Sequence, residues 1–347
     1  MLLFAADGLC QSGAEIYHSA CAACHGSDGK GAPARLVGFD TPLPDFTKCS
    51  FSTSEPDADW QSIVRRGGGA RGMSRNMPAF GEALSVDAID SVIAYLRGFC
   101  ASRSWPSGNL NLPRALVTEK AFPENEAFVT TSVPTDIADR VNTRFVYERR
   151  LGARMQYEVV VPFNVVQFPG GWNRGLGDVE LGAKRVVFDN PRSGTIASAG
   201  FEATFPTGKE TEGLGNRLTV VEPFGTVTQM LPRQFFIHGQ VGMEFPVNVD
   251  AALNEVFWRA AGGRTFVQGG SGRAWSPMVE LVARREIEFG ERVRLDVLPE
   301  LHVTLSRRQH IMASGGISIP LTLRSRSPIM MGSLLWDWAQ GGLFSGW

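Results

Sequence analysis

The chain contains 347 residues with a formal net charge of −1 at pH 7, and 43% of its residues are hydrophobic. A chain of this length predicts two domains, and its near-neutral charge without a dense Lys/Arg run gives no indication of a nucleic-acid partner. The lack of any run of about 18 or more apolar residues excludes a membrane-spanning helix.

The first nine residues, beginning Met-Leu-Leu-Phe, are typical of the end of a signal peptide whose charged start is missing. Residues 1–9 are therefore interpreted as a signal remnant or a disordered start. A short helix is predicted over 12–20, because Ser12 is a suitable N-cap and apolar side chains then recur on one face.

The stretch Cys21-Ala22-Ala23-Cys24-His25 has the spacing at which a c-type haem (heme c) is attached to a protein. Each thiol adds to one vinyl group of the porphyrin, and the following histidine places its imidazole against the iron. A zinc half-site is the alternative, but it needs a second Cys/His pair at ligand spacing, and the sequence offers none. One covalent haem on Cys21 and Cys24, with His25 as proximal ligand, is therefore predicted. Its attachment occurs outside the cytoplasm, so the chain is expected to be exported.

Two methionines downstream, Met73 and Met77, are the candidates for the second axial ligand of the iron. Met77 precedes Pro78, which keeps the segment extended so that the thioether can reach the iron. Met73 lies among glycines and is the weaker candidate, and the alternative for both is a role as core gap fillers. On the proximal side, the carbonyl of Pro33 can accept the Nδ1–H of His25, unless Pro33 is an ordinary loop proline.

An amphipathic helix is predicted over 85–98, where Ile89, Val92, Ile93 and Leu96 recur at helical spacing. With this helix in place, residues 10–100 resemble a class I cytochrome c domain. The resemblance rests on the Cys-Ala-Ala-Cys-His motif, the Met-Pro-Ala-Phe-Gly segment and the closing Tyr-Leu-Arg helix.

The resemblance to class I cytochromes c implies an all-α fold whose first and last helices cross. Here the crossing is expected where Gly13 and Tyr17 meet Tyr95 and Leu96. The resemblance also implies single-electron transfer through a six-coordinate haem, with the thioether bonds on the two motif cysteines and the axial bonds on the motif histidine and Met77.

Two further cysteines, Cys49 and Cys100, fall within the same small domain. In an oxidising compartment they favour a disulfide between the loop and the end of the closing helix, and buried free thiols are the alternative. Residues 101–114 are rich in Pro, Gly, Ser and Asn and are predicted to be a linker. Residues 115–347 then form the second domain.

Beyond the predicted linker the apolar pattern alternates with a period of two. In 292–305 the odd positions are apolar and most even positions are polar or charged, and 154–163 and 234–245 repeat the scheme. Further strands are predicted at 178–188, 194–205, 217–229, 255–266, 275–285 and 309–321. About ten to twelve strands follow, long enough for the ~9–11 residues that a tilted membrane-spanning strand requires.

Two antiparallel architectures fit such strands. In a soluble sandwich the apolar faces meet in a core, whereas in an outer-membrane barrel they meet lipid and the polar faces line the interior. Long consecutive strands, frequent small residues and a recurring carboxylate on the polar faces favour the barrel. These carboxylates are Glu158, Glu180, Glu202, Glu244, Glu280 and Glu300. Their expected partners inside a barrel are Arg154, Lys184, Arg284, Arg294 and His302.

Residues 140–325 resemble the outer-membrane barrels grouped with the meta-pathway phenol-degradation porin-like proteins. The resemblance rests on segments such as Leu-Gly-Asp-Val-Glu-Leu-Gly-Ala-Lys at 176–184 and Phe-Pro-Thr-Gly-Lys at 205–209. The overall plan is similar to the fused cytochrome–porins of iron-oxidising bacteria, although the strand count here is lower and the cytochrome domain larger. Residues 334–347 are aromatic and interrupted by glycines, which predicts a tail at the membrane interface or a plug.

The sequence thus predicts an all-α cytochrome c domain followed by an all-β antiparallel, transmembrane barrel in the outer membrane of a Gram-negative bacterium. The expected function is single-electron transfer by the haem, across the membrane if the cytochrome domain plugs the barrel rather than lying on its periplasmic side. Expected partners are periplasmic or extracellular electron donor or acceptor proteins, metal ions and outer-membrane lipid. An electron carrier is favoured over a substrate-transforming enzyme, because no nucleophile with an adjacent base is evident.

Two alternative functions remain open from the sequence. One is a channel for small solutes with a tethered periplasmic cytochrome as electron carrier. The other is a soluble periplasmic redox protein with a β-sandwich binding domain. The histidines His238, His302 and His310 fall on polar faces of predicted strands, where ordinary hydrogen bonding is expected rather than a metal or substrate role.

Overall fold

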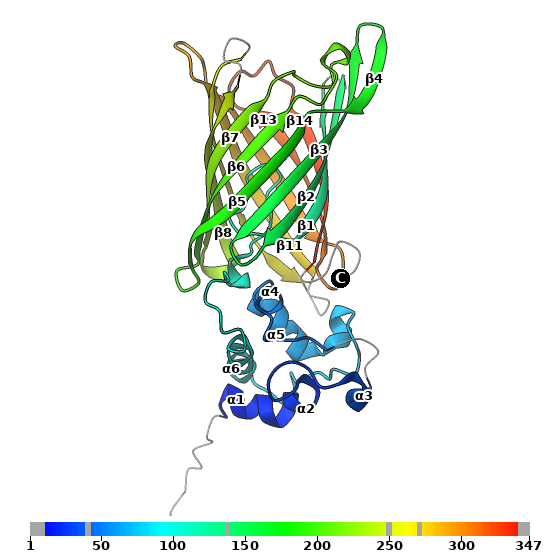
Figure 1. The fold of residues 1–347 in the computed structure, drawn as a ribbon, viewed down its shortest axis with the longest axis vertical. Helices are drawn as coiled ribbons and strands as arrows, with labels where there is room; N and C mark the ends of the chain where they lie inside the picture. The colour runs from blue at the N-terminus through cyan, green and yellow to red at the C-terminus, as the bar shows by residue number, and fades with distance from the viewer. Residues whose placement is uncertain (1–10, 39–42, 137–138, 248–251, 269–272, 339–347) are drawn as a thin grey trace, which may run out of the picture. The chain divides into compact units, whose positions relative to one another are not determined.

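A computed structural model describes all residues except 1–10, 39–42, 137–138, 248–251, 269–272 and 339–347. The chain divides into two compact units, Met1–Gly108 and Asn109–Trp347. The first unit is helical and the second is built from antiparallel strands (Figure 1). The predicted signal remnant at residues 1–9 lies outside the described residues.

The described part of the first unit consists of short helices joined by turns. In chain order they are α1 (Gly13–Ile16), the π-helical turn η1 (Tyr17–Cys21), α2 (Ala22–His25), α3 (Ala34–Val37), α4 (Cys49–Ser52), α5 (Asp57–Arg66), the 3-10 turn η2 (Gly68–Arg71) and α6 (Val86–Arg97). Helix α6 confirms the helix predicted over 85–98. The Ser85 hydroxyl accepts the N–H of Ala88 at 3.2 Å as its N-cap, and the predicted apolar stripe is buried.

The first and last helices of this unit cross, as the resemblance to cytochromes c implies. A side chain at Gly13 would place its Cβ only 2.0 Å from the Ser91 carbonyl oxygen, so glycine is what lets the two backbones approach. The rings of Tyr17 and Tyr95 then pack with their centroids 5.3 Å apart. Helix α1 begins at a capping box, in which Ser12 accepts the N–H of Glu15 and the Glu15 carboxylate accepts the N–H of Ser12.

A single hydrophobic core holds the helical unit together. Its buried members are Ile16, Tyr17, Phe46, Trp60, Val64, Ile89, Val92, Ile93 and Leu96. Arg97 covers one side of this core. Its guanidinium stacks 4.1 Å over the Trp60 ring and pairs with Asp57. A disulfide joins Cys49 to Cys100, with Cα atoms 5.1 Å apart, which confirms the predicted bridge, although Cys49 begins the short helix α4 rather than lying in a loop.

The second unit is a closed antiparallel barrel. Its strands are β1 (Glu126–Pro134), β2 (Arg140–Leu151), β3 (Met155–Phe168), β4 (Gly171–Leu176), β5 (Val179–Asn190), β6 (Thr195–Phe205), β7 (Val220–Met230), β8 (Phe235–Pro246), β9 (Glu255–Arg264), β10 (Phe266–Gln268), β11 (Arg273–Glu286), β12 (Arg294–Thr304), β13 (Ile311–Pro320) and β14 (Ile329–Asp337). Short 3-10 turns lie at η3 (Gly108–Leu110), η4 (Glu210–Glu212) and η5 (Pro232–Gln234).

Twelve strands of the described residues form a ring with no free edge. Consecutive ring strands are antiparallel neighbours. Strand β3 pairs with β5 and β9 pairs with β11, because β4 and β10 lie outside the ring, and β14 pairs with β1 to close it. Strand β4 is a hairpin partner of β3 outside the ring, and β10 pairs with one end of β11. The ring confirms the predicted all-β barrel and falls within the predicted ten to twelve strands.

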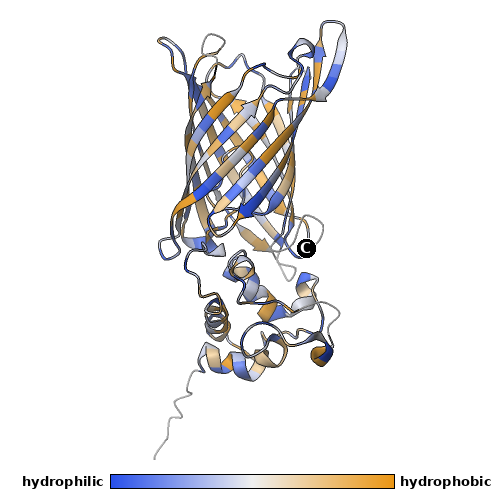
Figure 2. Ribbon diagram, in the orientation of Figure 1, coloured by the Kyte–Doolittle hydropathy of each residue, from blue (hydrophilic) through white to orange (hydrophobic). Residues whose placement is uncertain are grey.

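The burial pattern of the barrel is inverted relative to a soluble domain. Its buried side chains include Glu148, His238 and Glu280, each 0% exposed, whereas Phe145 is 48% and Val241 57% exposed. Apolar and polar residues alternate along the strands (Figure 2). A sandwich would bury its apolar faces, so this pattern excludes the sandwich alternative. Among the helices of the described residues, none is long and apolar enough to cross a membrane.

The structure corrects the prediction for the carboxyl end of the chain. Residues 334–337, assigned from the sequence to an aromatic tail, belong to β14, and Leu335 pairs with both Phe128 of β1 and Met312 of β13. The glycines that disfavoured a strand lie further on, at 341, 342 and 346, outside the described residues. The first four residues of the aromatic stretch thus belong to the strand that closes the ring.

Candidate functional site

The Cys-Ala-Ala-Cys-His motif lies on one helical turn of the first unit. Cys21 ends η1, and Cys24 and His25 lie on α2. Both thiols are free and half-buried. Helix α2 ends at Gly26, whose φ of +74° is a left-handed conformation that favours glycine. The motif therefore presents two thiols and an imidazole from a short, sharply terminated helix.

The His25 side chain packs against the core of the helical unit. Its ring lies 5.1 Å from the Phe46 ring, and burial lowers its pKa below the ordinary value for histidine. The imidazole is thus neutral near pH 7, which is the form that binds a metal.

The structure distinguishes between the two interpretations of Pro33 that the sequence left open. The His25 Nδ1 is buried and has no hydrogen-bond partner among the described residues. The carbonyl of Pro33 instead accepts the N–H of Leu36 at 2.8 Å, within the first turn of α3. Pro33 therefore behaves as a loop proline, which is one of the two interpretations that the sequence left open.

Met77 is held against the end of α5. The N–H of Gly68 donates to the Met77 carbonyl at 3.1 Å. Gly67 has a φ of +78°, and a Cβ at this position would lie 2.9 Å from the Met77 carbonyl oxygen. Met77 packs against the same hydrophobic core as Cys21, whereas Met73 is 42% exposed. Of the two candidate thioethers, only that of Met77 faces the core.

These groups fit a covalent haem better than a zinc ion. The ligand atoms of Cys21, Cys24 and His25 do not gather within 4.8 Å of one another, as three ligands of one metal ion would. Two free thiols, a mostly buried imidazole and a core-facing thioether are the groups that a thioether-linked, His/Met-ligated iron uses.

Replacement of Met77 by alanine is expected to abolish the sulfur–iron absorption band at the red edge of the oxidised spectrum, because the thioether that produces the band is lost. The measurement is the visible spectrum of purified holoprotein. Met73→Ala is the matched control and should leave the band in place. Loss of the band in Met73→Ala alone would assign the ligand to Met73 instead.

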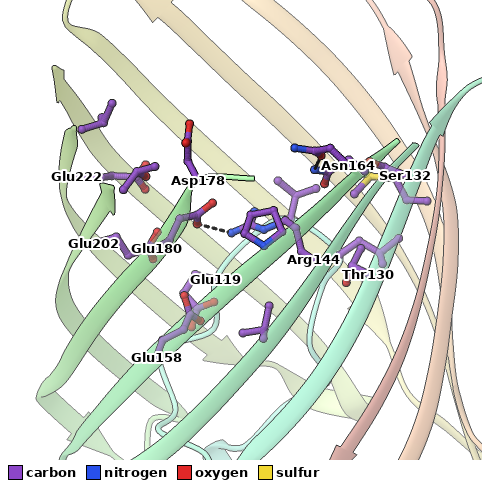
Figure 3. A pocket seen from close by; sticks show the side chains of 18 of the residues that line it. Glu119, Thr130, Ser132, Arg144, Glu158, Asn164, Asp178, Glu180, Glu202 and Glu222 are labelled. Atoms are coloured by element: carbon purple, nitrogen blue, oxygen red, sulfur yellow. Dashed lines mark hydrogen bonds and ion pairs between the residues drawn. The ribbon is translucent and has the colours of Figure 1, made fainter. Parts of the chain in front are cut away.

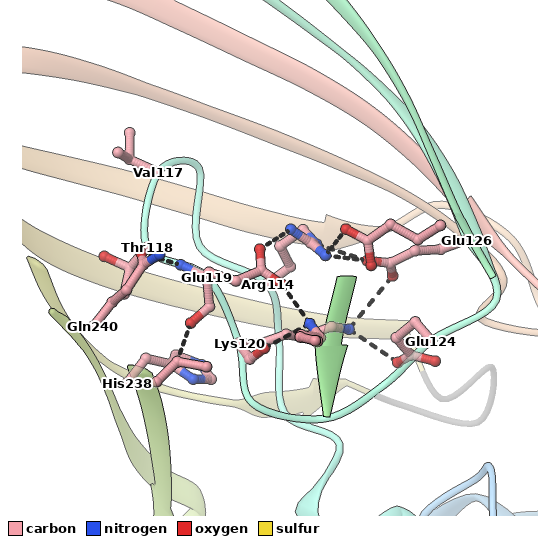
Figure 4. A network of polar contacts seen from close by, with 12 residues as sticks. Arg114, Val117, Thr118, Glu119, Lys120, Glu124, Glu126, His238 and Gln240 are labelled. Carbon is pink, nitrogen blue, oxygen red and sulfur yellow. Dashed lines mark hydrogen bonds and ion pairs between the residues drawn. The ribbon is translucent and has the colours of Figure 1, made fainter. Parts of the chain in front are cut away.

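The second unit contains a feature that the sequence pattern did not reveal. Residues 110–125, here called the luminal segment, run through the interior of the barrel (Figure 4). Inward side chains from opposite walls bind its backbone. Gln156 of β3 accepts the N–H of Glu124 at 2.6 Å, and Glu280 of β11 accepts the N–H of Thr118 at 2.7 Å. The end of the predicted linker thus lies inside the barrel.

Arg114 is the centre of the charged contacts of the luminal segment. Its guanidinium pairs with Glu119 at 2.9 Å, with Glu126 at 2.6 Å and with Glu148. Lys184 also pairs with Glu119. Carboxylate oxygens of Glu119, Glu148 and Glu158 lie within 4.8 Å of one another, so the cations hold together carboxylates that would otherwise repel one another.

The predicted partners of the interior carboxylates were wrong in detail. Glu280 and Glu300 do point inward, but they accept backbone N–H groups of the luminal segment. The predicted cationic partners bind other groups: Arg154 pairs with Asp189, Lys184 with Glu119, Arg284 with Glu255 and Arg294 with Glu286, and His302 bonds to Ser314.

Each of the three barrel histidines bonds to a polar group within the chain, and for His238 and His302 these are the ordinary hydrogen bonds that were predicted. His238 lies between the Thr228 hydroxyl at 2.8 Å and the Pro113 carbonyl at 3.0 Å. His302 bonds to Ser314 at 2.9 Å, and His310 pairs with Asp337 at 2.5 Å.

A polar cavity of about 630 Å³ lies beside the luminal segment (Figure 3). One wall carries a glutamate from each of five strands in succession, namely Glu158, Glu180, Glu202, Glu222 and Glu244. Four arginines of the cavity come from the strands β2, β9 and β11, namely Arg140, Arg144, Arg259 and Arg284, and a fifth, Arg114, comes from the luminal segment. The cavity therefore carries many charged side chains beside apolar ones, and the strands that supply its glutamates differ from the strands that supply its arginines.

The first unit matches a known protein family. Residues 8–96 match the model of the family described as "Cytochrome C oxidase, cbb3-type, subunit III". The chain thus joins a cytochrome c domain to a closed twelve-stranded barrel, and a cytochrome c domain implies haem c. Among curated proteins, none matches the sequence.

Several solved structures resemble the barrel. An outer membrane channel from Pseudomonas putida F1 aligns with a TM-score of 0.46 and 14% identity, over 65% of this chain and 99% of that one. The KdgM porin aligns with a TM-score of 0.42 and 8% identity, over 61% and 98%. The NanC porin aligns with a TM-score of 0.41 and 9% identity, over 61% and 98%.

Proposed function

We propose that this chain is a membrane-anchored electron carrier, in which the helical unit holds one covalent haem c and the barrel fixes that unit to the outer membrane of a Gram-negative bacterium. The observation that carries the proposal is the presence in one chain of a Cys-Ala-Ala-Cys-His helix and a closed barrel with an apolar exterior. When bound, the haem supplies a one-electron iron couple.

In this proposal the helical unit supplies four groups to the haem. Cys21 and Cys24 form the thioether bonds, and His25 and Met77 are the axial ligands. The packing of Phe46 against the imidazole supports this assignment, because apolar side chains beside an axial ligand keep water away from it. The low local polarity then contributes to the redox potential.

The barrel is proposed to be the membrane anchor. Its shortest ring strands have 9 residues and its longest 14, and a tilted strand needs about 9–11 residues to cross the apolar layer. Tyr147 lies 6.2 Å from Tyr157, ring centre to ring centre, near the turn that joins β2 to β3 at one end of the ring, and both side chains are partly exposed. Such aromatic groups are typical of a membrane–water interface.

The luminal segment supports an anchor rather than an open pore. It crosses the interior and is bonded to strands on opposite walls, including β3 and β11.

One haem cannot span an apolar band of ~25 Å, so the proposed carrier must receive its electrons from one partner and pass them to another. Electron donor or acceptor proteins, or redox-active metal ions, are the partner classes that a one-electron carrier requires.

The carrier proposal is tested by expressing the full chain in a host that matures c-type cytochromes. The outer-membrane fraction is expected to give a band that stains for haem after denaturing electrophoresis. In the intact fraction, the reduced haem is expected to be reoxidised by an impermeant oxidant. A Cys21→Ser/Cys24→Ser variant is the control, and it should reach the same membrane without haem staining. A colourless wild-type protein, or one that stays in aqueous buffer without detergent, would contradict the proposal.

The cavity supports a second candidate, passage of small polar solutes through the barrel. This route requires the luminal segment to move, because that segment lies in the lumen. Its tip is held by Glu280 and Glu300, which accept the backbone N–H groups of 116–118. If the barrel conducts, a Glu280→Ala/Glu300→Ala variant should show a higher ion conductance in planar bilayers than the wild type. Equal conductance in the two proteins would rule against this candidate.

A further inference from the structure

Tyr17 is a fully buried tyrosine beside the Cys-Ala-Ala-Cys-His helix. Its side chain is 0% exposed. The hydroxyl donates to the Gly26 carbonyl at 2.6 Å and lies 3.3 Å from the His25 carbonyl. His25 is the last residue of α2 and Gly26 is the C-cap of this helix. The phenol therefore reaches the backbone from which the His25 side chain projects.

The aromatic ring of Tyr17 is packed against Tyr95 of α6 and against Phe99, two residues after the end of this helix. Its centroid lies 5.3 Å from that of Tyr95 and 5.4 Å from that of Phe99. The close approach at Gly13 sets the distance between α1 and α6, and the π-helical turn η1 begins at Tyr17 itself. The hydroxyl is thus carried by a ring that has little freedom to move.

The His25 imidazole has no such support of its own. A metal-binding histidine ordinarily donates its second ring N–H to an acceptor that fixes the ring orientation. The Nδ1 of His25 has no partner among the described residues. The backbone of His25 is held instead, because its carbonyl accepts the N–H of Gly31 at 2.9 Å and lies within reach of the Tyr17 hydroxyl.

We propose that Tyr17 is a positioning residue for His25, and that its hydroxyl fixes the α2 backbone so that the imidazole keeps one orientation toward the haem. This inference rests on the proposed function, since it concerns the axial ligand of the proposed haem. It assigns to Tyr17 a role beyond helix packing. The ring alone would pack equally well as phenylalanine, so the hydroxyl is the group under test.

The experiment compares Tyr17→Phe with Tyr95→Phe in the purified full-length holoprotein. Both changes remove one hydroxyl from the same aromatic cluster, but the Tyr95 hydroxyl bonds to the side chain of His18 at 3.2 Å rather than to the α2 backbone. Tyr17→Phe is expected to shift the midpoint potential and to broaden the low-spin electron paramagnetic resonance signal, because the imidazole then samples several orientations. Tyr95→Phe is expected to match the wild type in both measurements.

A third variant, Phe99→Leu, separates positioning from stability. It loosens the packing around Tyr17 without removing the hydroxyl, so it should lower the melting temperature and leave the midpoint potential unchanged. Tyr17→Phe behaving like Tyr95→Phe would overturn the proposal. So would an equal potential shift in Phe99→Leu, or failure of Tyr17→Phe to form any holoprotein. Absence of haem from the wild type would instead refute the proposed function, before any variant is compared.

Discussion

Replacement of His25 by alanine is expected to leave a protein without the low-spin spectrum of a six-coordinate c-type haem. The imidazole is the proposed proximal ligand, and neither adjoining residue, Cys24 or Gly26, has a side chain that can take over the axial position once both motif thiols are bonded to the porphyrin. The measurements are the reduced and oxidised absorption spectra and the yield of haem-stained chain. A strongly reduced yield, or a high-spin spectrum, is the expected outcome.

His18→Ala is the matched control for the His25 variant. His18 lies on η1 only seven residues before His25, but it is exposed and its ring bonds to the Tyr95 hydroxyl at 3.2 Å. Its loss should leave both the spectrum and the yield of holoprotein close to those of the wild type. An intact low-spin spectrum in His25→Ala would mean that the iron takes its nitrogen ligand from elsewhere in the chain.

Replacement of Arg114 by alanine is expected to lower the free energy of unfolding of the barrel by roughly 3–5 kcal/mol, the range for breaking a buried ion pair from one side. The Arg114 side chain is 10% exposed and pairs with Glu119, Glu126 and Glu148. Its removal leaves two buried carboxylates, Glu126 and Glu148, and the partly buried Glu119 without this partner, and Lys120 and Lys184 are the cations that still pair with Glu126 and Glu119. Urea unfolding of the detergent-solubilised barrel measures the change.

Arg217→Ala is the control for the Arg114 variant. The Arg217 side chain is 76% exposed and pairs with Glu210, which is also exposed. An exposed pair contributes about 0–1 kcal/mol, so this variant should unfold close to the wild type. Equal unfolding curves for Arg114→Ala and the wild type would show that the luminal segment contributes little to the stability of the barrel.

Local sequence patterns predicted the elements of both units well. Ser85 and the stripe from Ile89 to Leu96 located α6, because a helix cap and a helical period depend only on near neighbours. Alternation located most ring strands, and the polar side of 292–305 proved to be the buried side, with Glu300 6% and His302 4% exposed. The Cys49–Cys100 disulfide could be predicted from the sequence because both cysteines fall in one small unit.

The failures concern contacts between residues that are distant in the chain. The Gln156, Glu280 and Glu300 side chains bind residues 116–124, which follow the predicted linker and for which the sequence pattern predicted no strand. Charge patterning could not assign those partners, because a carboxylate that faces a lumen can accept a backbone N–H as well as a cationic side chain. The Tyr17 hydroxyl was missed for a similar reason, since its acceptor becomes a neighbour only after η1 and α2 have formed.

The sequence by itself determined the chemistry and the architecture: a thiol pair with an adjacent histidine, a helical first unit and an alternating second one. These follow from spacing and period, which are properties of neighbouring residues. Only the tertiary structure decided that β14 closes on β1, that the luminal segment occupies the interior, and that His25 is held through its backbone rather than through Nδ1. Each of these depends on long-range packing and hydrogen bonding, and no local pattern along the chain encodes them.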